Sequence, residues 1–320
     1  MSDASVHPVP PPDPHSAVAA ENYRTSRGRW RLVAFLALAL VALVALGRFA
    51  MPETGLGDHI ARVDIDGTIA TDPARLEMFE TLAEENGVKA VIIAINSPGG
   101  TMAGGEELYE AVTRLRAAKP TVAVVKELGA SAAYMTAIAT SRIFTRRLSI
   151  VGSIGVLFQH VNAGKLLDTI GIDLDKVASG PLKAEPDYDE PLTGEVRASI
   201  QALVNDSFEW FVDVVAVERG LERSRVLELA DGRIVTGRVG LELGLVDAIG
   251  GEAEALEWLE AEHDIDSDLP IVTAWPPPQQ GFDWLGAVLG GELRAALGLP
   301  ASGPVALDGL VALWQVDPAP

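Results

Sequence analysis

The sequence predicts an α/β fold with largely parallel strands. Two continuous apolar runs, residues 88–95 and 121–127, are typical of strands that are buried on both faces of a sheet. Helical patterns at residues 103–118 and 131–139 follow them, and a glycine-containing loop joins each strand to its helix. Strands that alternate with helices in this way favour parallel pairing. The 320 residues, 48% of them hydrophobic, suffice for one large domain or two modest ones.

The N-terminal part of the chain is predicted to form a tail followed by a membrane anchor. Residues 1–29 are rich in proline, serine and alanine and predict a disordered cytoplasmic tail. The uncharged apolar run at residues 32–47 would cover about 24 Å of a ~30 Å hydrocarbon core. With its flanking residues it predicts a transmembrane signal-anchor over residues 30–51. A cleaved signal peptide and a buried core helix are the alternatives. The arginines before the run place the N-terminus in the cytoplasm: Arg24, Arg27, Arg29 and Arg31.

The sequence predicts that residues 52–263 form the folded domain. Residues 61–70 alternate apolar and polar side chains, as a half-buried strand does, and a long amphipathic helix is expected over residues 193–220. The composition changes at residue 264, and a run of three prolines follows at 276–278. Residues 264–320 are therefore predicted to form a C-terminal extension, either a membrane-facing or subunit-docking arm or a loosely packed tail.

The composition excludes several classes of function. A net charge of −20 would repel phosphate backbones, so no nucleic-acid partner is expected. The absence of cysteine excludes disulfides, thiolate nucleophiles and iron–sulfur clusters. The five histidines are scattered, with no pair at ligand spacing, and no metal site is expected. The excess of acidic residues fits either an extracytoplasmic domain or a high-salt habitat.

Two loops that follow buried strands contain the candidate chemistry. In the first, Gly99 and Gly100 would let backbone N–H groups point into a cleft, which suits an oxyanion hole. An ordinary Pro-Gly-Gly turn is the alternative. In the second, Ser131 lies between small residues at the first turn of a helix, where a nucleophile would be accessible. A plain N-cap role explains the same serine.

A serine nucleophile also needs a base. His160 with Asp168 would complete a triad, whereas Lys183 would form a dyad with Ser131. An amine is a base near neutral pH only when burial lowers its pKa from ~10.4 toward 7, and nearby carboxylates such as Glu185 and Asp187 would oppose that shift. Only six lysines could serve: Lys89, Lys119, Lys126, Lys165, Lys176 and Lys183.

Six short motifs between residues 60 and 255 together resemble the signal peptide peptidase A family, whose members are serine peptidases with a Ser–Lys dyad. The motifs occur in the family's order at residues 97–100, 130–134, 152–156, 179–183, 230–237 and 243–247. The resemblance implies a Clp/crotonase-like superhelix of repeated β-β-α units, preceded by one transmembrane helix. It also implies that no cofactor is needed.

The resemblance assigns roles to individual residues. It makes Ser131 the nucleophile and Lys183 the general base. It also assigns the backbone oxyanion donors and a hydroxyl that orients the base: Gly99, Gly100 and Ala132 as donors, and Ser153 as the hydroxyl. Many relatives have two glycines where this chain has Ala132 and Ala133, and the two methyl groups are expected to narrow the cleft.

The implied function is that of a membrane-anchored serine endopeptidase that degrades residual signal peptides and other unfolded peptides through an acyl-enzyme. Its catalytic domain would face the periplasmic, extracytoplasmic side of the inner (cell) membrane. A single catalytic unit implies a homo-oligomer in which Ser131 and Lys183 can meet across a subunit boundary. The alternatives are a Clp-like peptidase with His160 as base, acyl-CoA chemistry on the same fold, and a non-catalytic membrane scaffold.

Overall fold

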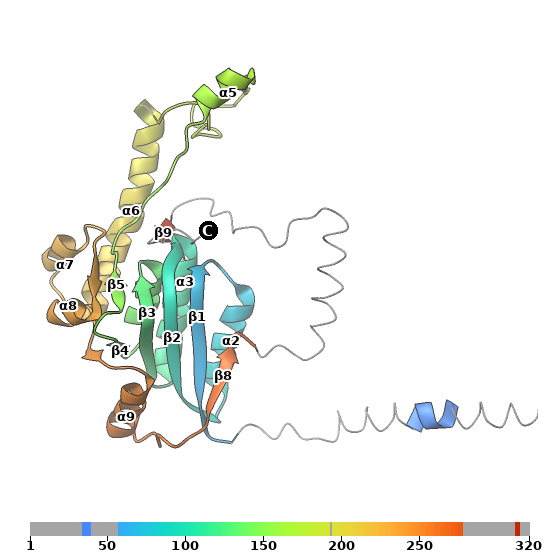
Figure 1. Ribbon diagram of the computed structural model, residues 1–320, viewed down its shortest axis with the longest axis vertical. Coiled ribbons are helices and arrows are strands. Elements are labelled where there is room, and N and C mark those ends of the chain that lie inside the picture. The colour runs from blue at the N-terminus through green and yellow to red at the C-terminus, as the bar shows by residue number, and fades with distance from the viewer. Residues whose placement is uncertain (1–33, 40–56, 193, 278–310, 314–320) are drawn as a thin grey trace, which may run out of the picture. The chain divides into compact units, whose positions relative to one another are not determined.

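The computed structural model describes residues 34–39, 57–192, 194–277 and 311–313 (Figure 1). The chain divides into two compact units, residues 1–57 and residues 58–320.

In the first unit, residues 34–39 are helical. Within the residues that the structure describes, no helix is both long and apolar enough to cross a membrane. The predicted anchor at residues 30–51 lies mostly outside the described residues, and the predicted tail at residues 1–29 lies wholly outside them.

The second unit is built on a single sheet. Its described residues contribute nine strands. Six of them lie in the order β6-β5-β3-β2-β1-β8, while β4 pairs with β3 and β7, and β9 pairs with β2. All pairings are parallel except β2–β9 and β5–β6. The predicted α/β fold with largely parallel strands is therefore confirmed. The strands are β1 (His59–Ile69), β2 (Val88–Thr101), β3 (Thr121–Ala130), β4 (Arg142–Thr145), β5 (Ile150–Gly152), β6 (Ile234–Thr236), β7 (Ala248–Ile249), β8 (Ile271–Trp275) and β9 (Val311–Leu313).

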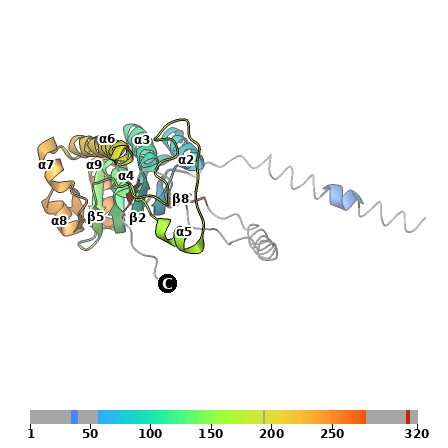
Figure 2. The ribbon, with the colours of Figure 1, turned by 90° about the horizontal axis from the view of Figure 1, so that it is seen from above.

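Helices cover both faces of this sheet. Figure 2 shows α2, α3 and α6 side by side along one face, where Phe79, Leu108, Tyr134 and Phe211 belong to the larger apolar core. On the opposite face α9 places Leu259 in a smaller core. The helices are α2 (Pro73–Glu84), α3 (Met102–Ala118), α4 (Ala132–Ile138), α5 (Gly164–Ile170), α6 (Gly194–Arg219), α7 (Arg223–Leu229), α8 (Gly237–Glu242) and α9 (Glu252–His263).

Local sequence explains where the first helices begin. The Asp72 carboxylate accepts hydrogen bonds from the backbone N–H groups of Ala74 and Arg75, and Pro73 occupies the first helical position of α2. Thr101 caps α3 in the same way, with its hydroxyl accepting from the Gly104 N–H at 3.0 Å. Because Thr101 is also the last residue of β2, strand and helix follow without an intervening loop.

The structure differs from the sequence expectations in two segments. The glycine loop expected after residue 95 belongs to β2, which continues to Thr101 because Gly99 and Gly100 pair with β1 beyond a register shift. The C-terminal extension expected at residues 264–320 contributes β8, which pairs in parallel with β1, and β9, which pairs with β2. At least these two segments are thus part of the sheet.

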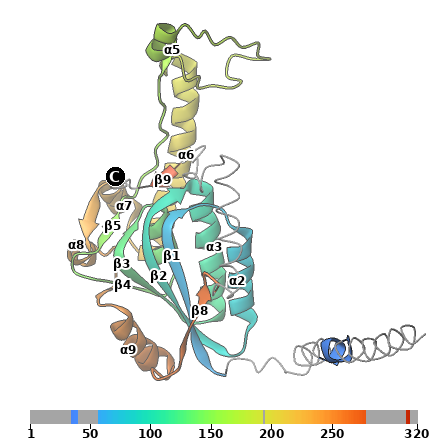
Figure 3. The ribbon, with the colours of Figure 1, turned by 45° about the vertical axis from the view of Figure 1, so that its right-hand side comes forward.

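An arm, defined here as residues 157–207, extends beyond the sheet (Figures 1 and 3). It contains α5 and the first half of α6. Among the residues of α6, the buried ones all lie in the second half: Phe211, Val212, Val214 and Val215. The arm exposes bulky apolar side chains: Leu157, Val161, Leu166, Ile170, Ile172, Leu174, Val177, Leu182, Tyr188 and Leu203.

The second half of α6 is fixed to α3 through Glu218. The Arg116 guanidinium donates to this carboxylate at 2.7 Å, and the Tyr109 hydroxyl donates to it at 2.7 Å as well. Burial by itself would raise the pKa of Glu218, but these hydrogen bonds outweigh burial and leave the pKa below its ordinary value.

We expect Glu218→Gln to lower the free energy of unfolding by about 2 kcal/mol at pH 7, because it removes the negative charge that Arg116 and Tyr109 bind. A carboxyl group whose pKa is lowered by folding stabilises the fold above its unfolded pKa, here near 4.5. The difference between wild type and variant should therefore shrink as the pH falls through the folded pKa. Urea unfolding at pH 7 and pH 4 measures this. Glu242→Gln, which breaks an exposed pair with Arg238, is the control and should change little.

Candidate active site

Ser131 lies at the junction of β3 and α4 in a strained conformation. Its φ of 59° and ψ of −121° are rare for a residue other than glycine, and such strain costs on the order of 1–3 kcal/mol. The position is held by backbone hydrogen bonds: the Ser131 N–H donates to the Gly152 carbonyl at 2.8 Å, and the Ser131 carbonyl accepts from the Tyr134 N–H at 2.9 Å. The side chain makes no capping hydrogen bond to α4. The plain N-cap interpretation therefore does not describe this serine.

The residues after Ser131 anchor the junction in the core. All residues of α4 are buried, and the Tyr134 hydroxyl donates to the Leu245 carbonyl at 2.7 Å. The Ala132 and Ala133 side chains belong to the larger apolar core, and a Cβ at Gly105 of α3 would lie 3.0 Å from the Ala132 Cβ. The expectation that the two alanine methyl groups narrow the cleft is thus wrong, because both methyl groups pack inward. As the first residue of α4, Ala132 also has an N–H that the helix itself does not bond.

Ser153 lies beside Ser131 at the end of the neighbouring strand. Ala130 of β3 pairs with Gly152 of β5, and each of these is followed by a serine with positive φ, 59° for Ser131 and 52° for Ser153. The Ser153 N–H donates to the Arg233 carbonyl at 2.8 Å, and the residue is 8% exposed. The two serines thus emerge at the same end of two adjacent parallel strands.

Gly99 and Gly100 form the end of β2, on the other side of β3. Gly99 has a φ of 103°, and its N–H donates to the Ser97 hydroxyl at 3.1 Å. Ser97 is fully buried and in turn donates to the Gly67 carbonyl at 2.5 Å. The sequence reasoning gave Ser97 no role of its own, although its place just before Pro-Gly-Gly was the available signal. Because its N–H is already engaged, Gly99 is a weaker candidate for an oxyanion donor than Ala132.

Lys183 lies on the arm, and the described part of this chain does not bring its side chain to Ser131. Its backbone N–H donates to the Gly180 carbonyl at 3.1 Å, and its side chain is exposed. The carboxylates of Glu185 and Asp187, expected to compete for Lys183 if close, instead bind Lys176. These hydrogen bonds raise the pKa of Lys176. Sequence reasoning did not identify this role for Lys176.

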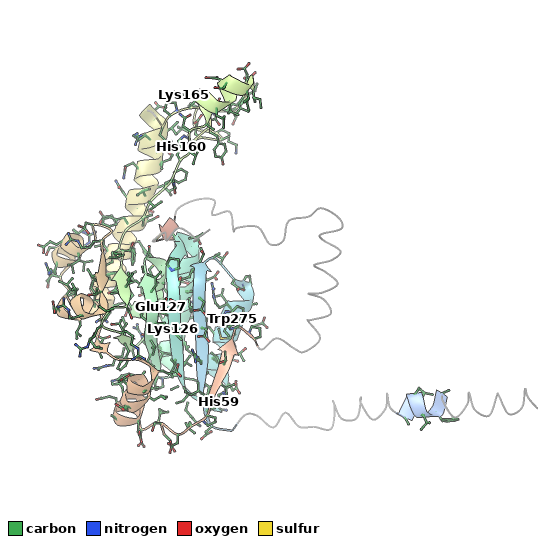
Figure 4. The ribbon with its side chains drawn as sticks, viewed as in Figure 1. His59, Lys126, Glu127, His160, Lys165 and Trp275 are labelled. Carbon is green, nitrogen blue, oxygen red and sulfur yellow. The ribbon has the colours of Figure 1, made fainter. Side chains whose placement is uncertain are left out.

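His160 lies on the arm as well (Figure 4). Its Nε2 is 2.9 Å from the Glu190 carbonyl oxygen, another arm residue. Asp168 lies exposed on α5, where its carbonyl accepts from the Gly171 N–H. No triad of Ser131, His160 and Asp168 is assembled within the described residues. In the same residues no group of three or more histidine or acidic side chains could hold a metal ion.

Known proteins resemble this chain over the region that contains these residues. The profile of Peptidase family S49 matches residues 113–266. The protein named "Putative protease slr0021" of Synechocystis sp. is 36% identical over 218 residues, which cover 68% of this chain and 78% of that protein. "Putative signal peptide peptidase SppA" of Enterococcus faecium is 31% identical over 214 residues, 66% of this chain and 62% of that protein.

Among solved structures, a ClpP1 mutant from Listeria monocytogenes is similar at a TM-score of 0.40 and 16% identity, over 60% of this chain and 92% of that one. The resemblance that the six motifs predicted is confirmed by the relatives at the level of the family. The identity to the Synechocystis protein extends over more than two thirds of both proteins, and the chain is therefore a serine peptidase that belongs to peptidase family S49.

Proposed function

We propose that this peptidase is an endopeptidase in which Ser131 of one subunit is activated by Lys183 of a neighbouring subunit. The observation that carries the proposal is the conformation of Ser131, which is strained, lacks a capping bond and lies beside Gly100, Ser153 and the N–H of Ala132. Strain of this kind persists where the surrounding structure enforces it, and it is frequent at catalytic residues.

The chemistry follows from these groups. Neutral Lys183 takes the proton of the Ser131 hydroxyl as the oxygen attacks a peptide carbonyl, and it passes this proton to the amine that leaves. The backbone N–H groups of Gly100 and Ala132 stabilise the oxyanion, and water then hydrolyses the acyl-enzyme. Ser153, next to the nucleophile, orients the lysine. No cofactor takes part.

The arm supports assembly from several copies. It holds Lys183 away from its own sheet and exposes many apolar side chains, as a surface does that packs against another subunit. An amine that is covered by a neighbouring copy loses water, which is the condition for it to act as a base. We propose in addition that the domain folds as a Clp/crotonase-like superhelix. The oligomer would then contain one such active site at each boundary between subunits.

We further propose signal peptides and other unfolded peptides as substrates, with residues 30–51 as the anchor and the peptidase unit outside the cytoplasm. The substrate follows the printed name of the Enterococcus faecium relative. The anchor follows the uncharged run at residues 32–47.

Mixing two inactive variants tests the proposal. Ser131→Ala and Lys183→Ala should each abolish hydrolysis of a fluorogenic peptide. When they are mixed under conditions that exchange subunits, active sites with an intact Ser131 and an intact Lys183 form, and about a quarter of the wild-type activity should return if the subunits assort at random. His160→Ala is the control and should stay active. Retained activity in Lys183→Ala contradicts the dyad, and inactive mixtures despite exchange contradict a site shared between subunits.

A further inference from the structure

The edge of β2 beside Ser131 already accepts an extended segment of chain. β9 pairs with it in the antiparallel direction, with Gly99 opposite Leu313, Gly100 opposite Ala312 and Thr101 opposite Val311. β9 also contacts α3, which begins directly after Thr101. Figures 1 and 3 both show β9 at this end of β2, near α6. The pairing gives the direction of an extended peptide on this edge.

The register relates that direction to the reactive serine. Ser97 of β2 pairs in parallel with Gly129 of β3, so Ser131, two residues further on, lies level with Gly99. A peptide that takes the place of β9 on this edge has the residue opposite Gly99 nearest to Ser131. The residues that precede it run past Thr101 toward Met102. The amino-terminal side of a bound substrate therefore extends toward the start of α3.

A pocket of about 270 Å³ lies at the start of α3. Its lining comes from the start of α3 and the middle of α6: Met102, Glu106, Asp206, Ser207 and Trp210. Trp210 is held in place by an edge-to-face contact with Tyr109, with ring centroids 6.0 Å apart. The lining of the pocket thus combines the apolar side chains of Met102 and Trp210 with two carboxylates and contains no basic side chain.

Both carboxylates are free to bind a ligand. Within the described residues neither Glu106 nor Asp206 takes part in an ion pair, whereas Glu110, one turn further along α3, pairs with Arg114. Two carboxylates over Met102 and Trp210 suit a side chain with an aliphatic stem and a cationic end.

We propose that this pocket is a substrate subsite that selects lysine or arginine at the third or fourth residue on the amino-terminal side of the cleaved bond. The inference rests on the proposed endopeptidase function. The stem of the substrate side chain packs on Met102 and Trp210, and its charged end lies between Glu106 and Asp206. Exposed charge pairs contribute modestly, so the preference over an uncharged side chain of equal length is about fivefold.

Fluorogenic peptides that carry lysine, norleucine or glutamate at these two positions test the preference on the full chain. We expect kcat/KM to be about fivefold higher for lysine than for norleucine, and this ratio to fall toward one in the double variant Glu106→Gln/Asp206→Asn. The ratio should also fall as salt is added. Glu110→Gln removes a carboxylate from the same helix outside the pocket and should keep the wild-type ratio.

A charge reversal separates recognition from a structural defect. In Glu106→Lys/Asp206→Lys the preferred peptide should become the glutamate peptide, which a merely damaged pocket would not produce. A wild-type ratio near one, or a ratio that survives the double neutral variant, overturns the subsite.

Peptide binding to the Ser131→Ala chain tests the subsite without catalysis. Fluorescence anisotropy measures this binding for the same peptides. Preferential binding of the lysine peptide without any Ser131-dependent hydrolysis by wild type would overturn the proposed function and leave the subsite standing. Ser131-dependent hydrolysis with no preference in rate or in binding would overturn the subsite alone.

Discussion

Replacement of Ser131 by alanine is expected to lower the rate of peptide hydrolysis by about four orders of magnitude or more, since it removes the proposed nucleophile. Labelling by a fluorophosphonate, which reacts with activated serine hydroxyls, should disappear as well. The effect on stability should be small, because alanine is strained at a φ of 59° as serine is and the serine side chain makes no capping bond.

The measurement compares rates, labelling and urea midpoints for wild type and Ser131→Ala. Ser141→Ala is the matched control, because this serine is exposed and lies just beyond α4. Labelling that persists in Ser131→Ala would show that another serine is the nucleophile. Unchanged hydrolysis in the variant would show that the strain at this junction serves another purpose.

Gly100→Ala is expected to cause the largest loss of stability. A Cβ at this position would lie 1.8 Å from the Ile69 carbonyl oxygen and 2.5 Å from its carbon, both backbone atoms of the paired strand β1. Since β1 lies within the sheet between β2 and β8, it cannot move aside without breaking other pairings. We expect the free energy of unfolding to fall by about 3 kcal/mol.

Urea unfolding of the two proteins measures this loss. Gly180→Ala on the arm is the control, because nothing lies within 4 Å of its Cβ position, and its midpoint should stay close to that of wild type. Equal midpoints for Gly100→Ala and wild type would mean that β1 and β2 are not as closely paired here as described.

Elements with strong local patterns were predictable from sequence. The apolar run at 121–127 corresponds to β3, and the helical pattern at 103–118 corresponds to α3, each within a few residues. A strand that is buried on both faces has a continuous apolar sequence, and a helix that is buried on one face has apolar residues at helical spacing, so both can be recognised from sequence. The continuation of β2 through Gly99 and Gly100 was not predictable. A Pro-Gly-Gly sequence normally indicates a turn, but here Gly100 is required by the close approach of the Ile69 backbone, a contact that exists only between strands.

The candidate site divides in the same way. Sequence motifs identified Ser131, Ser153 and the glycines, and the structure places them at the ends of three neighbouring strands, β2, β3 and β5. The burial of the Ala132 methyl group against Gly105 and the pocket lined by Met102 and Trp210 depend on residues far apart in the chain, which no local pattern records.

By itself the sequence determined the class of fold, the peptidase family and the identity of the candidate nucleophile, because these depend on local periodicity and on short motifs. Only the tertiary structure decided how those residues are presented. The strain at Ser131 arises from hydrogen bonds to a neighbouring strand and to its own helix, and the exposure of Lys183 arises from an arm that extends beyond the sheet. The first depends on pairing with a strand that comes later in the chain, and the second on the absence of packing between the arm and the sheet, and a local sequence pattern expresses neither.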